Sequence, residues 1–117
     1  MPLNNPAMVL AANALRTAIT HGQLHSGDPG ASGTSNVTTA ARQAITWSAA
    51  TADGDFGLSA ALNFTGVAAS GAVTYLSLWS ATTAGTWYGN FALTGDATAN
   101  AAGEYTVTAL NLNGSAS

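Results

Sequence analysis

The chain has 117 residues, of which 6% are charged. This length suits one domain with a modest core, and the charged fraction is far below the roughly 25% of an ordinary soluble domain. Two arginines carry all of the Lys and Arg charge, which excludes a site for the phosphate backbone of a nucleic acid. The absence of cysteine excludes disulfides, thiolate nucleophiles and cysteine-ligated zinc. We therefore expect a single domain over residues 1–117 whose weakly charged surface is covered by partners.

The amino-terminal sequence, MPLNNPAM, lacks the basic and apolar segments of a signal peptide. No apolar run in the chain approaches the roughly 18 residues that a membrane helix requires. We therefore expect neither a leader nor a membrane anchor in this sequence.

Residues 5–19 are predicted to form a helix. Asn5 suits the N-cap, and Pro6 suits the first helical position, where its missing N–H costs no hydrogen bond. Gly22 is expected to end the helix in a left-handed conformation. The apolar stripe of this helix consists of Met8, Ala11, Ala12, Leu15 and Ile19.

The next segment, HGQLHSGDPGASGTSN, holds both histidines of the chain and a nearby carboxylate. His21, His25 and Asp28 could close a metal site if the segment were extended, because residues four apart then share a face. The metalloprotease form of this histidine spacing needs a helix and a glutamate after the first histidine, and here Gly22 follows it. We favour a strand end and a shaped turn, leading into a flexible-looking loop over residues 26–36 that contacts a neighbouring subunit.

Beyond this loop, apolar residues recur with a period of two, which is typical of strands. The expected strands are residues 42–49, 57–64, 72–80, 86–93 and 104–112. The third of them has Leu76 and Leu78 on one face and Trp79 on the other, so we expect a central strand that is covered on both sides. The pattern predicts a mainly β fold, a small antiparallel β-sandwich or barrel-like domain with its core in residues 42–112 and one amino-terminal helix.

The last expected strand changes phase by one residue. Val107 points inward in its first half, and Leu110 points inward in its second half. This change indicates a β-bulge, or a strand that moves from one sheet to another, near Ala109.

The acidic residues show no catalytic arrangement. The triplet DGD at residues 53–55 could contribute to a calcium site, but the other oxygen ligands of a calcium loop are missing, so we favour a tight turn. The carboxylates that could form a catalytic pair, Asp53, Asp55, Asp96 and Glu104, all lie in or beside predicted turns. No serine lies in a nucleophile elbow. We predict no enzyme activity, no catalytic residue, no metal and no cofactor.

Three tryptophans raise a second possibility, because exposed tryptophans stack on sugar rings. Trp47, Trp79 and Trp87 each lie on or beside the apolar phase of an expected strand. This position favours packing in the core over a binding platform. A platform would require at least one of the three to be exposed.

Five segments of the chain resemble a family of small virion proteins of tailed phages that infect actinobacteria. They are the amino-terminal helix and the segments LHSGDPGASGTSNV, ARQAITWSAA, TYLSLWSATTAGTWYGNFALT and GEYTVTALNLNGS. The resemblance covers almost the whole chain. It implies a structural component of the virion without catalytic residues, and members are named variously as tail-fibre or minor tail proteins.

Within the virion, we expect a non-catalytic capsid decoration protein, that is, a minor capsid protein on the outer shell. The reason is that the chain is one compact domain without the heptads or repeats that extend a fibre. Its partners would be the major capsid protein or tail-tip proteins, and other copies of itself in a homo-oligomer. The alternative is a tail-fibre or minor tail subunit with a host-surface or glycan-binding role.

Overall fold

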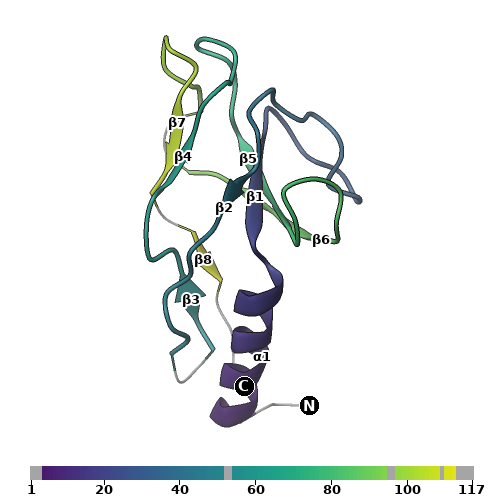
Figure 1. Ribbon diagram of the computed structural model, residues 1–117, viewed down its shortest axis with the longest axis vertical. Coiled ribbons are helices and arrows are strands. Elements are labelled where there is room, and N and C mark those ends of the chain that lie inside the picture. Colours follow the sequence, from purple (N-terminus) through teal and green to yellow (C-terminus); the bar gives the residue numbers. More distant parts are fainter. Residues whose placement is uncertain (1–3, 52–53, 95–96, 109, 113–117) are drawn as a thin grey trace.

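The structure is a computed structural model and describes residues 4–51, 54–94, 97–108 and 110–112. It is elongated, with extents of 46, 24 and 21 Å, and helix α1 (Asn5–Ala18) stands at one end of the long axis (Figure 1). Antiparallel strands form most of the remaining regular structure. The predicted mainly β fold with one amino-terminal helix is confirmed. Among the described residues, no helix has the length and hydropathy of a membrane span.

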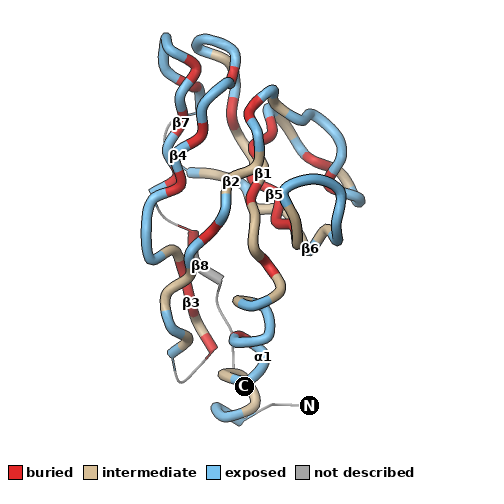
Figure 2. Tube along the Cα trace, in the orientation of Figure 1, coloured by how far each residue is buried: buried red, intermediate tan, exposed pale blue. Residues whose placement is uncertain are grey.

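Helix α1 begins one residue earlier than its predicted cap implies. Asn4 is the N-cap, and its side-chain oxygen accepts a hydrogen bond from the Ala7 N–H at 3.0 Å. Pro6 lies in the first turn, as expected, and the helix ends because Ile19 is extended. Ala12 is the one buried residue of α1, so much of the helix is exposed (Figure 2).

The predicted helix terminator, Gly22, is instead a residue of strand β1 (His21–His25), and the prediction is wrong here. A Cβ at this position would lie 3.2 Å from a methyl carbon of Leu76 and 3.4 Å from one of Ile45. Glycine therefore allows close packing in the sheet rather than a left-handed turn. Strand β1 lies on the amino-terminal side of the predicted β core of residues 42–112.

The strands form one four-stranded sheet and two ribbons of paired strands. The sheet has the order β2 (Gln43–Ala44), β1, β5 (Tyr75–Trp79) and β6 (Trp87–Ala92). The ribbons are β4 (Leu62–Phe64) with β7 (Tyr105–Val107), and β3 (Phe56–Gly57) with β8 (Asn111–Leu112). Neighbouring strands are antiparallel throughout.

The strands are shorter than the sequence pattern predicts. The expected strand 57–64 is divided between β3 and β4, and the expected strand 104–112 is divided between β7 and β8. Because β7 and β8 pair with different strands, the predicted change of sheet near the end of the chain is confirmed. Ala109, where we placed it, lies outside the described residues.

The core lies between the four-stranded sheet and the β4–β7 ribbon. Its members include Leu24, Leu76 and Leu78 from the sheet and Leu62, Phe64, Tyr105 and Val107 from the ribbon. Residues 76–79 are all buried, which confirms the prediction of a strand covered on both sides. Because successive side chains alternate, His25 and Ser77 point to the face of the sheet opposite Leu24 and Leu76.

Candidate functional site

The two histidines lie at opposite ends of β1, on one face of the strand. Four residues at about 3.3 Å per residue separate them by roughly 13 Å along the strand, too far for both rings to bind one metal ion. His21 hydrogen-bonds the Thr20 hydroxyl at 2.8 Å. Asp28 is exposed and accepts a hydrogen bond from the Gly30 N–H at 2.9 Å. In the part of the chain that the structure describes, no three His, Asp or Glu side chains gather as metal ligands would.

His25 is fully buried and belongs to a chain of hydrogen bonds in which the donor and the acceptor of each bond can be assigned. Its Nδ1 lies 2.8 Å from the carbonyl oxygen of Ser35, so Nδ1 carries the proton and donates it. The Nε2 atom is therefore an acceptor, and it receives the Ser77 hydroxyl at 2.6 Å. The Ser77 oxygen in turn accepts the indole N–H of Trp79 at 2.7 Å.

This serine and histidine pair is structural rather than catalytic. Ser77 is 0% exposed, so a substrate cannot reach its hydroxyl, and the hydroxyl is already used as both donor and acceptor. Burial lowers the pKa of His25; the carbonyl of Ser35 opposes this effect, and the positive charge of Arg42 adds to it. The neutral imidazole therefore holds the loop that follows β1 onto the sheet.

Residues 26–36 form a compact loop with a defined shape. The Ser26 N–H donates to the Asn36 carbonyl at 2.8 Å, which brings the two ends together. The Asn36 amide donates to the Asp28 carbonyl at 2.9 Å, and the Ser35 N–H donates to the Pro29 carbonyl at 3.0 Å. The segment that looks flexible in sequence is therefore an Ω-loop closed by its own hydrogen bonds.

Strand β6 fixes the far side of this Ω-loop. The Asn90 amide donates to the Gly30 carbonyl at 2.9 Å, and the Trp87 indole N–H donates to the Asn90 side-chain oxygen at 2.9 Å. Gly33 has φ +69° and lies against the Trp87 indole, which a Cβ would overlap. The loop is thus joined to β5 through His25 and to β6 through Asn90 and Trp87.

Arg42 covers a neighbouring part of the same sheet face. Its guanidinium carbon lies 4.0 Å from the centroid of the Trp79 ring, a cation–π contact. Its Nε donates to the Gln23 side-chain oxygen at 3.0 Å, and its Nη1 donates to the carbonyls of Ala81 and Ala84 at 3.0 and 2.7 Å. One side chain therefore ties the β5–β6 hairpin to β1.

The three tryptophans contribute to packing, and none of them forms an exposed platform. Trp79 is 6% exposed. Trp47 is half-buried, donates to the Ile19 carbonyl at 2.8 Å and meets Phe56 edge-on. Trp87 is half-buried beneath the Ω-loop. The sugar-binding platform considered for these residues is therefore not present.

The acidic segment at residues 53–55 forms a turn where it is described. The Gly54 N–H donates to the Thr51 carbonyl at 2.9 Å, and the Thr51 N–H donates to the Asp55 carbonyl at 2.9 Å. Gly54 has φ +84°, a conformation that favours glycine. Asp53 and Asp96 lie outside the described residues.

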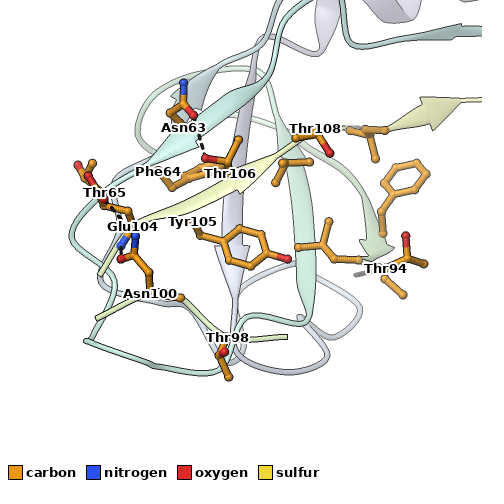
Figure 3. Close-up of a pocket in the computed structure, with 16 residues that line it drawn as sticks. Asn63, Phe64, Thr65, Thr94, Thr98, Asn100, Glu104, Tyr105, Thr106 and Thr108 are labelled. Carbon is orange, nitrogen blue, oxygen red and sulfur yellow. Dashed lines mark hydrogen bonds between the residues drawn. The ribbon is translucent and has the colours of Figure 1, made fainter. Parts of the chain in front are cut away.

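A groove with a volume of about 1230 Å³ lies between the β4–β7 ribbon and the end of β6 (Figure 3). Phe91, Leu93 and Tyr105 supply apolar surface to it. Its remaining lining is mainly polar and includes Asn63, Thr94, Thr98, Asn100, Glu104 and Thr108. Figure 3 shows the Tyr105 ring turned into the groove, with Glu104 and Asn100 at one end and Thr94 at the other.

Nearly the whole sequence matches a family of phage proteins. Residues 9–115 match the family described as podophage GP4 fiber I protein gp80. The chain belongs to this family. It is therefore a structural component of a phage virion, which confirms the predicted location and the predicted structural class. No curated protein sequence matches the chain.

The sequence analysis did not predict two features of this gp80 family member, namely the buried hydrogen bonds of Ser77 and the groove. One feature of the sequence could have indicated the role of Ser77, since it is a lone polar residue between Leu76 and Leu78 in a strand expected to be buried. No such feature indicated the groove, because its walls come from segments that are distant in the sequence. Glu104 was considered only as half of a catalytic pair, whereas it lies on the rim of the groove.

Proposed function

We propose that the chain is a non-catalytic subunit of a fibre on the virion of a podophage. The match of residues 9–115 carries this proposal, because the family description names a fibre protein. A fibre role replaces capsid decoration as our preferred function for that reason. The resemblance to virion proteins of actinobacteriophages further favours an actinobacterial host.

The surface composition supports a role in a multi-chain assembly. The formal net charge of the chain is −3, with 6% charged residues, and such a surface gives little protection against association. The elongated outline, 46 Å along its longest axis, suits stacking of subunits along a fibre. The partners in this proposal are other fibre or tail proteins and further copies of the chain.

Helix α1 is the element that we assign to self-association. A helix of 14 residues is marginally stable by itself, and tertiary packing normally supplies the missing stability. In α1, Leu10 is 72% exposed and Leu15 is 40% exposed. Arg16 is the one charged residue of the helix, so identical copies can pack together with little repulsion. The homo-oligomer in this proposal is formed by α1 helices of several copies.

The copy number per virion tests the fibre role. Quantitative mass spectrometry of purified virions would compare this chain with the major capsid protein, and gold-labelled antibodies would locate it by electron microscopy. A fibre subunit should be far less abundant than the capsid protein and should be labelled at the tail. An abundance comparable to that of the capsid protein, with label over the shell, would contradict the fibre role and support capsid decoration.

Sedimentation equilibrium tests the role of α1. The variant Leu10→Gln should shift the purified chain towards monomer, because it places an amide at the apolar contact between helices. Asn5→Gln is the control, since Asn5 is an exposed polar residue of the same helix and lies on a different side of it from Leu10. Equal masses for the wild type and both variants would contradict self-association through α1.

A further inference from the structure

The groove between the β4–β7 ribbon and the end of β6 has the size of a ligand site. Its volume of about 1230 Å³ exceeds the roughly 300–1,000 Å³ of most small-molecule pockets. A ligand longer than one ring is therefore needed to fill it. The groove is partly open to solvent.

Several polar groups on the rim are already oriented by hydrogen bonds. The Asn100 side-chain oxygen accepts the backbone N–H groups of Ala102 and Glu104 at 3.0 and 2.9 Å, and its amide donates to the Glu104 carboxylate at 3.1 Å. The Thr106 hydroxyl donates to the Asn63 side-chain oxygen at 2.9 Å. The threonines Thr94, Thr98 and Thr108 are exposed and add hydroxyl groups.

The charges around the groove argue against an anionic ligand. Arg16, Arg42 and the two histidines are all of the basic side chains in the sequence, and none of them lines it. An anionic ligand would therefore meet no counter-charge.

The remaining chemistry fits a neutral sugar. A sugar ring has an apolar face of C–H groups and a rim of hydroxyls, each of which can donate and accept hydrogen bonds. The half-buried side chains of Phe91 and Leu93 offer apolar surface to the C–H face, and the exposed threonine, asparagine and glutamate side chains offer hydrogen-bond partners to the hydroxyls.

We propose that this groove binds a neutral oligosaccharide chain. Glu104 and Asn100 hold sugar hydroxyls at one end, and the threonine hydroxyls contact the chain along its length. The biological meaning of this site rests on the proposed fibre role, since a fibre carries its subunits to the surface of the host cell. Binding itself is a property of the isolated chain, so it can be tested apart from the position on the virion.

Titration of the full-length chain with neutral hexasaccharides tests the site. The probes are hexamers of glucose, galactose, mannose, arabinose and N-acetylglucosamine, with sulfated and uronic-acid oligomers as anionic comparisons. Calorimetry and saturation-transfer NMR would measure binding. At least one neutral hexamer should bind more tightly than the anionic probes, and Glu104→Gln should weaken that binding about tenfold, since a charge-assisted hydrogen bond is lost.

A second variant avoids any effect of charge. Thr98→Val with Thr108→Val removes two exposed hydroxyls without a change of shape, and it should also weaken binding several-fold. Matched controls outside the groove are Asp28→Asn for the carboxylate and Thr46→Val with Thr83→Val for the exposed threonines, and these should bind as the wild type does. Unchanged melting temperatures would show that each variant is folded.

Three outcomes would overturn the saccharide site. They are no binding by any neutral hexamer, equal affinity in groove and control variants, and tighter binding of the anionic probes. A change of oligomeric mass in the groove variants, without saccharide binding, would assign the groove to a second copy of the chain. These results are independent of copy number, so a failed saccharide site and a failed fibre role can be told apart.

Discussion

The Nε2 atom of His25 lies 2.6 Å from the hydroxyl oxygen of Ser77, 52 residues further along the chain. This bond joins the end of β1, where the Ω-loop begins, to the middle of β5. Both side chains are 0% exposed, so water cannot replace either partner. The stability of the loop and the stability of the central strand are therefore coupled at one point.

Replacement of Ser77 by alanine should destabilise the fold. The variant leaves the Nε2 of His25 and the indole N–H of Trp79 buried without their hydrogen-bond partner, and each unsatisfied group costs about 1–3 kcal/mol. Urea unfolding followed by tryptophan fluorescence would measure the loss. Ser59→Ala, at an exposed serine, is the control and should change the unfolding free energy little. A loss in Ser77→Ala no larger than in this control would contradict the account.

The unfolding free energy should fall as the pH falls below about 6.5. Burial lowers the pKa of His25 in the folded chain below its value of 6.5 in the unfolded chain. The unfolded state therefore binds the proton more readily, and stability that is fully present above pH 6.5 is lost between that value and the lower folded pKa. The slope for one histidine is at most about 1.4 kcal/mol per pH unit.

Urea midpoints measured over the pH range above and below this value would check the prediction. The variant His25→Gln should lose the part of the slope that comes from His25, although it is expected to be less stable at neutral pH. Midpoints of the wild-type chain that stay constant as the pH falls below 6.5 would show that His25 does not carry the effect.

The Gly33→Ala variant should loosen the Ω-loop. Gly33 has φ +69°, and an added Cβ would overlap the Trp87 indole. The strain at one such position is of order 1–3 kcal/mol, and movement of the loop would relieve part of it. Faster hydrogen exchange of the amides in residues 26–36, with a smaller increase in β1 and β5, is the expected result. Ala31→Ser, at the exposed part of the loop, should leave exchange unchanged.

Truncation of Leu78 to alanine should cost about 2–5 kcal/mol, because the side chain is fully packed between the sheet and the β4–β7 ribbon. Leu10→Ala removes the same atoms from an exposed site of α1 and should have little effect on the unfolding free energy of a single chain. Chemical denaturation at low protein concentration would compare the two variants. Similar small losses would place β5 at an edge of the fold.

The sequence by itself determined the class of the fold and the place of its central strand. Alternation of apolar and polar residues depends on local geometry, so residues 72–80 could be identified as a strand covered on both faces. The change of phase near the end of the chain was visible for the same reason. The asparagine and proline residues at the amino-terminal end of the helix indicated its start to within one residue.

Predictions from local sequence patterns were wrong where the role of a residue depends on contacts with residues distant in the sequence. Gly22 follows a helix and resembles a terminator, but Leu76 and Ile45 decide its role, because their methyl groups occupy the space of a side chain. His25 and Asp28 are close in sequence and resemble metal ligands, yet β1 turns His25 towards Ser77 and leaves Asp28 exposed.

The groove is a product of the tertiary structure and could not be predicted from the sequence. Phe91 comes from β6 and Tyr105 from β7, strands of two different sheets. Periodicity shows which face of a strand is apolar, but it does not show which strands lie side by side or where two layers separate at an edge. That arrangement depends on packing among residues distant in the chain, so the candidate saccharide site appears only in the folded protein.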